Sequence, residues 1–380
     1  MTERPALAVV FPKASVTGGV ERIALELLRF EATRRSACFV GESLDADENL
    51  AFAPVSPSRV PRSFRPLAFR RSAAAVLREL APATTMSLGV NCPPGDVYWV
   101  NSVHRAWLED GGDLIVRGMK VPAVLRRALL RHQVLLRLER DYFVNHRPRA
   151  IVCTSERDVR DLQRLYHVPA ELIQLIPHGY DGQVFAPAHR AALRDKVRDE
   201  IGATRDDIVV LMIANEWHRK GLGTLLESVA ALRDARVRID LVGAKAPDDY
   251  RPLAQRLGLA ERLRWHGATR DVARFHAAAD VFALPTTYEP FGLVIIEAMG
   301  SGLPVITSRL AGAASAIDDG RNGLLLDDPR DTGRLTTQLG RLLDAAERER
   351  MGAAAAVAAA AGYEWNQVLT RVDAVLFPSS

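Results

Sequence analysis

Features that mark several specialised classes of protein are scarce in this chain of 380 residues. Its three cysteines, Cys38, Cys92 and Cys153, lie far apart, without the close spacing of a metal site or a disulfide framework. No stretch approaches the roughly 20 apolar residues that a membrane span requires. The apolar segment that follows Met1 is too short, and has the wrong flanks, for a secretory signal. Together these absences predict a protein of the reducing cytoplasm.

The charge of the chain is nearly balanced, so its net charge does not indicate that it binds nucleic acid or a membrane. The chain has 50 basic and 46 acidic residues, a formal net charge of +4, and only five of its basic residues are lysines. Such a balance does not by itself require nucleic acid or a membrane, because long-range attraction depends on where charges cluster. Hydrophobic residues make up 48% and charged residues 25%, as in folded globular proteins rather than disordered tails or filaments.

What the chain does contain is a repeated alternation of short apolar segments with turns and helical patterns. In the first half, the segments that predict buried parallel strands are residues 7–11, 37–40, 97–100 and 150–153. In the second half they are residues 208–213, 238–242, 263–266, 281–285, 304–307 and 323–326. The alanine-rich residues 353–361 predict a closely packed helix, and residues 363–376 predict one more amphipathic helix.

Length and composition predict two α/β domains. A chain of this length exceeds one ordinary core and fits two domains of similar size. Its composition turns polar, charged and helical over residues 182–198, before the second series of strands begins. We therefore place the boundary near residue 185, with an N-terminal domain over residues 1–184 and a C-terminal domain over residues 185–361. Each is expected to be a Rossmann-like, doubly wound sheet with helices.

The most informative segment covers residues 284–306. It places Glu289 in a turn after a strand and Glu297 in the following helix, at the same end of the sheet. The turn over residues 290–293 opens that helix, so the amides of its first turn can hold a phosphate, and Gly292 leaves room for it. The two carboxylates are then free to accept hydrogen bonds from sugar and ribose hydroxyls. Taken alone, they are as well explained as solvated carboxylates that cap a helix.

The whole segment resembles the retaining glycosyltransferases of family 4, which have the GT-B fold and use nucleotide sugars. The family's pattern of glutamate, seven residues and glutamate, within an EPFGL-type turn and an EAMxxGxPV helix and strand, is matched from Glu289 to Val305. The resemblance extends over nearly the whole chain and includes the lipopolysaccharide-type glucosyltransferases. It implies two facing Rossmann-like domains with a cleft between them, the acceptor on the first and the donor on the second. It also implies that a last helix, within residues 362–380, packs back on the first domain.

A basic loop after the first strand of the second half extends this resemblance. Lys220 matches the family lysine that neutralises the donor diphosphate while negative charge accumulates on the leaving group. The arginine that many members have about six residues earlier is absent, and Asn215 lies in that region. Arg219 is a candidate substitute, and which basic residue pairs with Lys220 stays open. Without the resemblance, a surface pair of basic residues that caps a helix would explain the loop.

Other matched positions are individually weaker signals. Gly18 and Gly19 resemble a glycine loop that approaches the diphosphate and the sugar, and His104 resembles a histidine that contacts the sugar near its reacting carbon. A plain turn and an exposed histidine are the alternatives. His178 stands where an interdomain segment usually has asparagine. His266 and Gly267 lie where the family lines its base pocket, through backbone groups.

The resemblance thus implies a complete set of site residues. The implied catalytic residues are His104, Lys220 and Glu289. The implied donor-binding residues are Gly18, Gly19, Asn215, Arg219, Lys220, His266, Gly267, Glu289, Phe291, Gly292, Leu293 and Glu297. No metal and no other cofactor is expected, because helix-end amides and basic side chains offset the diphosphate charge. The leaving phosphate itself would help to deprotonate the acceptor on the front face of the sugar.

The implied function is the transfer of a hexose from a nucleotide sugar, with UDP favoured over GDP, to a hydroxyl of a glycan, lipid-linked or small-molecule acceptor. A GT-B-like nucleotide-sugar epimerase or a phosphorylase, and a catalytically silent nucleotide-sugar-binding protein, remain the alternatives. No nucleic acid partner is expected. Peripheral contact with an anionic membrane is a further hypothesis, because arginines cluster among apolar residues in the first half. These arginines are Arg59, Arg62, Arg65, Arg70, Arg71, Arg78, Arg126, Arg127, Arg131, Arg137 and Arg140.

Overall fold

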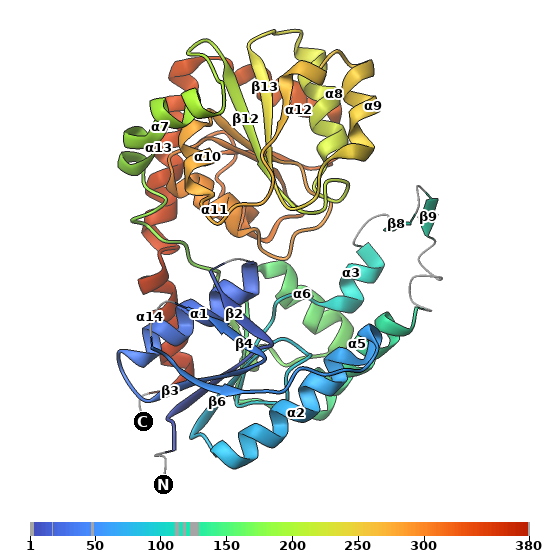
Figure 1. Ribbon diagram of the computed structural model, residues 1–380, viewed down its shortest axis with the longest axis vertical. Helices are drawn as coiled ribbons and strands as arrows, with labels where there is room; N and C mark the ends of the chain where they lie inside the picture. The colour runs from blue at the N-terminus through green and yellow to red at the C-terminus, as the bar shows by residue number, and fades with distance from the viewer. Residues whose placement is uncertain are drawn as a thin grey trace. The chain divides into compact units, whose positions relative to one another are not determined.

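A computed structural model describes residues 4–16, 18–46, 49–110, 114–116, 119–121 and 129–378, without the side chains of residues 110, 114–116 and 119–121. The chain divides into two compact units (Figure 1). Unit 1 comprises residues 1–178 and 366–380, and unit 2 comprises residues 179–365. Both are α/β structures built on parallel sheets, as the alternation of apolar segments and helical patterns predicts.

Unit 1 is built on a sheet that has seven strands within the described residues, in the order β11-β10-β7-β6-β1-β3-β5, with every neighbouring pair parallel. These strands are β1 (Leu7–Val10), β3 (Ala37–Gly41), β5 (Ala51–Pro54), β6 (Thr84–Leu88), β7 (Val97–Trp99), β10 (Ala150–Cys153) and β11 (Ile173–Leu175). The short strands β2 (Lys13–Ser15) and β4 (Ser43–Asp45) form a second, parallel pair, and β8 (Leu114–Val116) and β9 (Met119–Val121) form an antiparallel pair. The predicted strands 7–11, 37–40, 97–100 and 150–153 are present, whereas β5, β6 and β11 had not been predicted.

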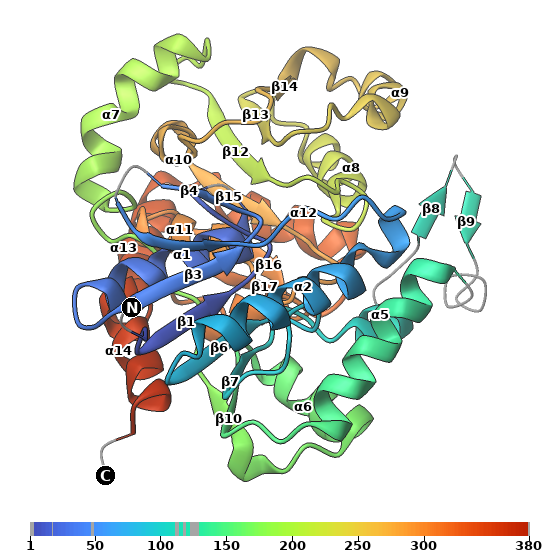
Figure 2. The same cartoon turned by 60° about the horizontal axis from the view of Figure 1, so that its bottom comes forward.

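Helices from both ends of the chain belong to unit 1. They are α1 (Gly19–Ala32), η1 (Arg62–Phe64), α2 (Arg65–Leu80), α3 (His104–Asp110), α5 (Leu130–Arg140), the π-helical η2 (Asp141–Asn145), α6 (Glu156–Tyr166), η3 (Ala170–Leu172) and α14 (Trp365–Leu376). Helices α2 and α5 pack against each other (Figure 2). The C-terminal helix α14 is bound to the unit by hydrogen bonds from Arg149 to the carbonyl oxygen of Leu376, 2.6 Å, and from Arg371 to that of Leu175, 2.7 Å.

Unit 2 is built on a parallel sheet of six strands within the described residues, in the order β14-β13-β12-β15-β16-β17. These strands are β12 (Ile208–Ile213), β13 (Val237–Val242), β14 (Leu263–Trp265), β15 (Val281–Leu284), β16 (Val305–Ser308) and β17 (Leu324–Leu326). The helices are α7 (Pro187–Glu200), α8 (Leu222–Leu232), η4 (Asp248–Tyr250), α9 (Arg251–Arg256), η5 (Ala260–Arg262), α10 (Ala273–Ala278), α11 (Leu293–Gly300), η6 (Gly312–Ala316), α12 (Thr332–Arg341) and α13 (Ala345–Gly362). All six predicted strands are present.

The strand order of unit 2 determines where a ligand can bind. From β12 the chain adds β13 and β14 on one side, and then β15, β16 and β17 on the other. The loops that follow β12 and β15 therefore leave the same edge of the sheet in the region where the order reverses. In sheets of this kind, ligands bind in the crevice at that switch point.

The division between the units differs by a few residues from the predicted boundaries at 184/185 and 361/362. The amide of Tyr180 donates to the carbonyl oxygen of Tyr363, 2.8 Å, and the amide of Trp365 donates to that of Tyr180, 3.1 Å. These hydrogen bonds join the two connecting segments, so unit 2 begins at Gly179 and ends at Trp365.

The alanine-rich segment forms part of α13, and its close packing is confirmed. The buried residues of this helix include Gly352, Ala355 and Ala359. A Cβ atom on Gly352 would overlap the carbonyl oxygen of Gly302, so the helix approaches its neighbour closely only because the residue there is glycine. Among the described residues, no helix combines the length and apolar character that would let it cross a membrane.

Candidate functional site

The loops that follow β12 and β15 are bound to each other at the switch point of unit 2. The amide of Thr287 donates to the carbonyl oxygen of Arg219, 2.9 Å, and the hydroxyls of Thr286 and Thr287 donate to the same oxygen at 3.2 and 3.1 Å. Gly221 has a φ of +83°, and a Cβ atom there would overlap the carbonyl oxygen of Pro285. Glycine at 221 is therefore what lets the two loops come together.

Lys220 and Glu289, one from each loop, form a direct ion pair. Both are largely enclosed, since the side chains of Lys220 and Glu289 are 9% and 15% exposed. Burial lowers the pKa of the Lys220 ammonium well below its ordinary value; the positive charge of Arg219 adds to this effect, and the carboxylate of Glu216 opposes it. The sequence assigns Lys220 to the diphosphate and Glu289 to the sugar. In the structure, the charges of these two side chains neutralise each other.

The ion pair lies beside the start of α11. Gly292 is the N-cap of this helix, has a φ of +101° and places no side-chain cap on it. A Cβ atom on Gly292 would come within 3.0 Å of Cγ of Glu289, so the side chain of Glu289 packs against the cap. The first amides of α11 have no intrahelical acceptors, and they point out of the helix with the positive end of its dipole. An ammonium and a helix N-terminus therefore converge where the sequence predicts the phosphate.

The other predicted residues of this segment are mostly enclosed. Phe291 is 2% exposed and packs in the core of unit 2, and its carbonyl oxygen accepts from the amide of Ala313, 2.8 Å. Leu293 is the first residue of α11 and is partly buried against the same core. Glu297, in the second turn of α11, is 3% exposed.

Arg219 holds the loops together. Its guanidinium donates to the carbonyl oxygen of Tyr288 and, over 2.5 Å, to the carboxylate of Glu216. Arg219 is the residue that the sequence suggests as a substitute for the family's missing arginine, and its guanidinium is already engaged in these hydrogen bonds. In this structure Arg219 positions the turn that carries Glu289, and its charge acts on Lys220 beside it.

The ends of β12, β13 and β14 form a second, continuous wall. The side-chain oxygen of Asn215 accepts from the amide of Ala244, 2.8 Å, and the amide of Gly243 donates to the carbonyl oxygen of Gly267, 2.9 Å. The amide of His266 is bound to Leu241, 2.9 Å. The structure thus brings Asn215, His266 and Gly267 together at the sheet edge where the sequence predicts the base pocket.

The two glycines predicted in unit 1 lie at the start of α1. Gly18 is the N-cap, with a φ of +95°, and Gly19 is the first helical residue. The carboxylate of Glu21 folds back so closely that a Cβ atom on Gly18 would overlap it. The sequence assigns the start of α1 to the diphosphate and the sugar. In the structure, the negatively charged carboxylate of Glu21 lies next to this helix start.

His104 is held from two sides at the start of α3. Its main-chain amide donates to the buried carboxylate of Glu139, and its Nε2 lies 3.1 Å from Nδ1 of His132. Its ring stacks on Trp107, with 5.6 Å between ring centroids. Burial, together with the nearby His132 and Arg131, lowers the pKa of His104 to about 4. His104 is therefore uncharged at neutral pH and can exchange hydrogen bonds without adding charge.

His178, which replaces the usual asparagine, is a buried residue of unit 1. Its ring stacks on Trp99 with 5.3 Å between centroids, and burial lowers its pKa to about 3. These contacts give it a structural role in that unit.

Sequence reasoning missed several residues that hold the candidate side chains. Glu139 and His132 lie on the same helix and bind His104, but no local pattern marks them. Asp240 forms a hydrogen bond with His266. The sequence does mark this residue, because Arg238 and Asp240 interrupt an otherwise apolar strand.

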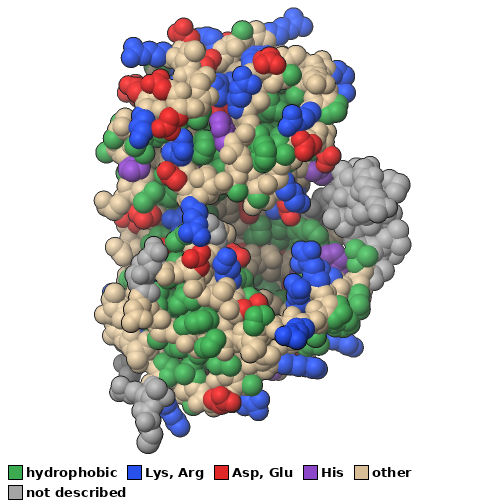
Figure 3. All heavy atoms as spheres, viewed as in Figure 1, with side chains coloured by type: hydrophobic (Ala, Val, Ile, Leu, Met, Phe, Trp, Pro, Cys, Tyr) green, Lys and Arg blue, Asp and Glu red, His purple; other side chains and the backbone are tan. Residues whose placement is uncertain are grey.

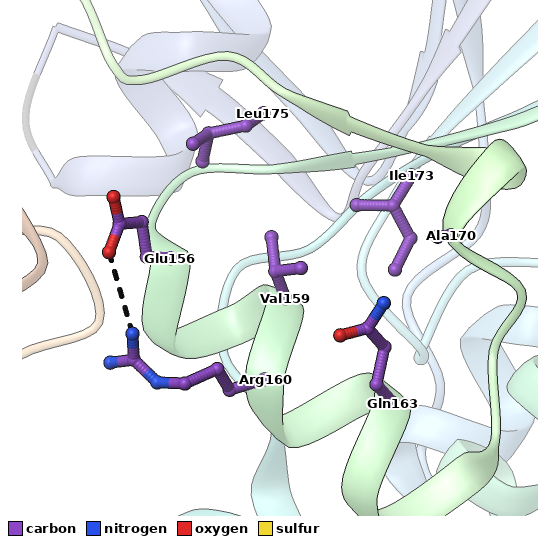
Figure 4. Close-up of a pocket in the computed structure, with 7 residues that line it drawn as sticks. All are labelled: Glu156, Val159, Arg160, Gln163, Ala170, Ile173 and Leu175. Atoms are coloured by element: carbon purple, nitrogen blue, oxygen red, sulfur yellow. Dashed lines mark hydrogen bonds and ion pairs between the residues drawn. The ribbon is translucent and has the colours of Figure 1, made fainter.

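A hollow on unit 1, with a volume of about 320 Å³, lies apart from all of these residues (Figure 4). It is lined by Glu156, Val159, Arg160, Gln163, Ala170, Ile173 and Leu175, of which Glu156 and Arg160 form an ion pair of 3.4 Å. No predicted site residue is among them. In the described part of the chain, no group of three or more His, Cys, Asp or Glu side chains is placed to hold a metal ion. That the reaction needs no metal stays a prediction.

Comparison with known proteins gives this geometry a context. Residues 207–345 match the family described as "Glycosyl transferases group 1", so unit 2 contains a domain of that family. The whole chain has the GT-B fold: a crystal structure of WaaG, a glycosyltransferase of lipopolysaccharide biosynthesis, covers 98% of it with a TM-score of 0.84 and 21% identity, and is itself covered completely. The predicted fold class of two Rossmann-like domains is confirmed.

The lipopolysaccharide glucosyltransferase WaaG of Escherichia coli is 26% identical over 67% of this chain and 67% of its own length. D-inositol 3-phosphate glycosyltransferase of Corynebacterium glutamicum is 31% identical over 47% of this chain and 45% of its own. The chain spans about half the length of the inositol 3-phosphate enzymes from Corynebacterium glutamicum and Nocardia farcinica. Anabaena HepE, solved with UDP and glucose, has a TM-score of 0.72 at 19% identity and covers 98% of this chain and 99% of its own.

Proposed function

We propose that this protein is a retaining glycosyltransferase of family 4 that transfers a hexose from a nucleotide sugar to a hydroxyl group. One observation carries the proposal: Lys220 meets Glu289 beside the glycine-capped start of α11, at the switch point of a doubly wound sheet. Helix-start amides and an ammonium are the groups that bind a diphosphate without a metal ion. The match of residues 207–345 to a glycosyltransferase family supports the same reading.

In the proposed reaction, Lys220 and the first amides of α11 bind the diphosphate and stabilise the charge that accumulates on it as the sugar bond breaks. The diphosphate competes with Glu289 for Lys220. Because burial lowers the pKa of this lysine, an incoming polyanion would favour its charged form, and binding and protonation support each other. Glu289, released from the pair, orients the hydroxyls of the sugar. The leaving phosphate helps to deprotonate the acceptor on the same face of the sugar.

The donor and the acceptor are proposed by chemical class. A UDP-sugar is favoured over a GDP-sugar, and the solved complexes of Anabaena HepE with UDP and with UDP-glucose support this preference. The acceptor is a hydroxyl of a glycan, a lipid-linked glycan or a small molecule, as the names of the WaaG and inositol 3-phosphate relatives suggest. We assign the donor to unit 2 and the acceptor to unit 1, with Gly18, Gly19 and His104 of unit 1 contacting the transferred sugar.

We also propose weak contact between unit 1 and an anionic membrane surface. Helices α2 and α5 expose Arg65, Arg71, Arg131, Arg137 and Arg140, and the neighbouring Phe64, Leu129 and Leu130 are 39%, 48% and 54% exposed. Figure 3 shows basic and hydrophobic side chains interspersed on unit 1. Arg126 and Arg127 lie outside the described residues. Cosedimentation with vesicles should increase with anionic lipid and decrease with salt.

The function is tested by incubating the protein with a panel of UDP-, GDP- and ADP-sugars. Thermal stabilisation by one nucleotide class, together with slow hydrolysis or transfer of its sugar, is the expected result. Thermal stabilisation with no turnover on any acceptor would favour the silent binding protein instead. Epimerised donor with no transfer would favour the epimerase.

A further inference from the structure

Three partly exposed rings of unit 1 gather where α3 packs against α5 (Figure 1). They belong to His104 and Trp107 of α3 and to His132 of α5, and we call these residues the aromatic cluster. The ring centroids lie 5.6 Å apart for His104 and Trp107, 5.1 Å for His104 and His132, and 5.7 Å for Trp107 and His132. Each ring therefore packs on both of the others, and none of the three residues is fully buried.

A buried carboxylate holds the aromatic cluster in place. Glu139 of α5 is 0% exposed and accepts hydrogen bonds from the main-chain amides of His104 and Arg105 at the start of α3, the second over 2.9 Å. The hydroxyl of Tyr166 donates to the same carboxylate. Nε2 of His104 and Nδ1 of His132 lie 3.1 Å apart, so one ring donates a hydrogen bond to the other. The rings are thus ordered without a ligand, which lowers the entropic cost of binding one.

Two ring nitrogens of the aromatic cluster are available to a ligand. Nδ1 of His104 and Nε1 of Trp107 have no hydrogen-bond partner among the described residues, and neither atom is buried. Burial, together with His132 and Arg131, lowers the pKa of His104 to about 4, so its ring is uncharged at neutral pH. Aromatic surface with a few polar atoms is the usual lining of a site for a small organic ligand.

A sugar ring has the chemistry that matches the aromatic cluster. One face of a pyranose presents mainly C–H groups, and the negative face of an aromatic ring attracts them. The hydroxyls lie around the edge of the pyranose, where they can exchange hydrogen bonds with a ring nitrogen such as Nε1 of Trp107. An acyclic polyol has hydroxyls but no continuous C–H face.

We infer that Trp107 is a specificity-determining residue, whose indole ring binds the C–H face of a sugar ring of the acceptor. The inference rests on the proposed function, because that function has His104 contact the transferred sugar. The attacking hydroxyl must come close to that sugar, so the acceptor ring must lie beside His104. Trp107 is three residues further along α3 and packs on His104. The acceptor is thereby narrowed to a glycan.

The test measures transfer from UDP-sugars to a panel of methyl pyranosides and to sorbitol, an acyclic polyol. At equal concentration, the wild type should transfer to at least one pyranoside about tenfold faster than to sorbitol. Trp107→Ala should raise the KM for that pyranoside about tenfold, the effect of one aromatic contact. It should change neither the KM for the donor nor donor hydrolysis without acceptor. Trp107→Phe keeps a ring but not the N–H group, and should restore the KM to within a few-fold of the wild type.

Phe52 offers a matched control. This residue is 38% exposed and its ring stacks on Phe39 with 6.0 Å between centroids, but it lies on β5 at the edge of the sheet. Phe52→Ala should keep both KM values.

A second measurement does not depend on any variant folding. In saturation-transfer NMR of the wild type, irradiation of aromatic protons of the protein should saturate the C–H protons on one face of the pyranoside more than those on the other. Equal saturation of the two faces would overturn the inference.

The outcomes separate this inference from the proposed function. If no nucleotide sugar is hydrolysed or used for transfer, both are overturned. If donor is consumed but sorbitol is used as fast as every pyranoside, or no pyranoside accepts the sugar, only the inference about Trp107 fails. An unchanged KM for the pyranoside in Trp107→Ala would also overturn that inference and leave the proposed function standing.

Discussion

The two units differ in the charges that surround their candidate residues. In unit 2, Lys220 and Glu289 are opposite charges in direct contact, enclosed at a helix start. In unit 1, the uncharged ring of His104 is held by another histidine, and Gly18 is faced by the carboxylate of Glu21. Among the candidate residues that the structure describes, the basic side chain suited to a diphosphate is Lys220 of unit 2. Binding of the nucleotide should therefore depend on unit 2, whereas residues of unit 1 should affect the sugar and its transfer.

Removing the ammonium of Lys220 should have the largest effect on activity. Lys220→Ala should lower the rate of sugar transfer by about 10²–10³-fold, because the developing charge on the diphosphate loses its charged partner. Initial rates with a UDP-sugar measure this effect. Lys196→Ala, on the exposed face of α7, is the matched control and should leave the rate unchanged.

Loss of Lys220 also leaves Glu289 buried without its counter-charge, which destabilises the fold. The double variant Lys220→Ala/Glu289→Gln removes both charges and should recover much of the lost thermal stability but none of the lost activity. Recovery of transfer in the double variant would contradict the role of Lys220.

Substitution of Gly292, the N-cap of α11, should have the next largest effect. Gly292→Ala should destabilise the protein by about 1 kcal/mol or more, because alanine is strained at a φ of +101°. It should also weaken UDP binding, since the new Cβ atom would lie within 3.0 Å of Cγ of Glu289. Thermal unfolding and UDP titration measure the two effects.

Gly258 offers a control for the strain alone. Its φ is +70°, but a Cβ atom there would meet nothing within 4 Å. Gly258→Ala should lower the unfolding temperature and keep the affinity for UDP. Equal affinities in the two alanine variants would mean that the contact between the cap and Glu289 has no part in binding.

Two buried aspartates should give the units opposite responses to pH. Burial raises the pKa of Asp158 in unit 1 to about 6, so its contribution to stability is full below its ordinary value and is lost as the pH rises through about 6. For Asp280 in unit 2, burial acts in the same direction, but Arg194, the amide of Val209 and Arg198 outweigh it and lower the pKa. Its contribution is therefore present above the ordinary value and lost as the pH falls through the folded pKa.

Thermal unfolding of Asp158→Asn and Asp280→Asn between about pH 3 and pH 7 tests these signs. The stability of Asp158→Asn relative to the wild type should rise with pH. That of Asp280→Asn should fall, by up to a few kcal/mol near neutral pH, because two arginines lose their anionic partner. Parallel curves for the two variants would contradict the assignment.

The smallest effect is expected at His132. His132→Phe removes the partner of Nε2 of His104 and should lower transfer only a few-fold, the effect of one uncharged hydrogen bond. The affinity for UDP should not change, because His132 lies in unit 1. His189→Gln, on the exposed side of α7, serves as the control. A loss of UDP affinity in His132→Phe would break the separation of roles between the units.

How far the sequence predicts the fold differs between the units for a physical reason. Strands β12, β15 and β17 of unit 2 are apolar runs that are almost entirely buried, so their pattern is visible in the sequence. In unit 1, the edge strand Ile173–Leu175 is largely exposed, and Thr84–Leu88 is half polar. Short strands of this kind lack the apolar pattern on which prediction depends.

The candidate site shows the same limit. The turn around Glu289 and the loop around Lys220 are visible as motifs, but nothing local shows that the two side chains touch. That contact arises from the order of β12 and β15 in the sheet. The pairing of His104 with His132 likewise depends on the packing of α3 against α5, which a sequence pattern does not contain.

A crystal structure of the protein with bound UDP tests whether Lys220 and the start of α11 bind the diphosphate. The β-phosphate should lie within hydrogen-bond distance of Nζ of Lys220 and of the main-chain amide of Leu293, with Glu289 displaced from the lysine. UDP bound elsewhere, with Lys220 still paired to Glu289, would contradict it.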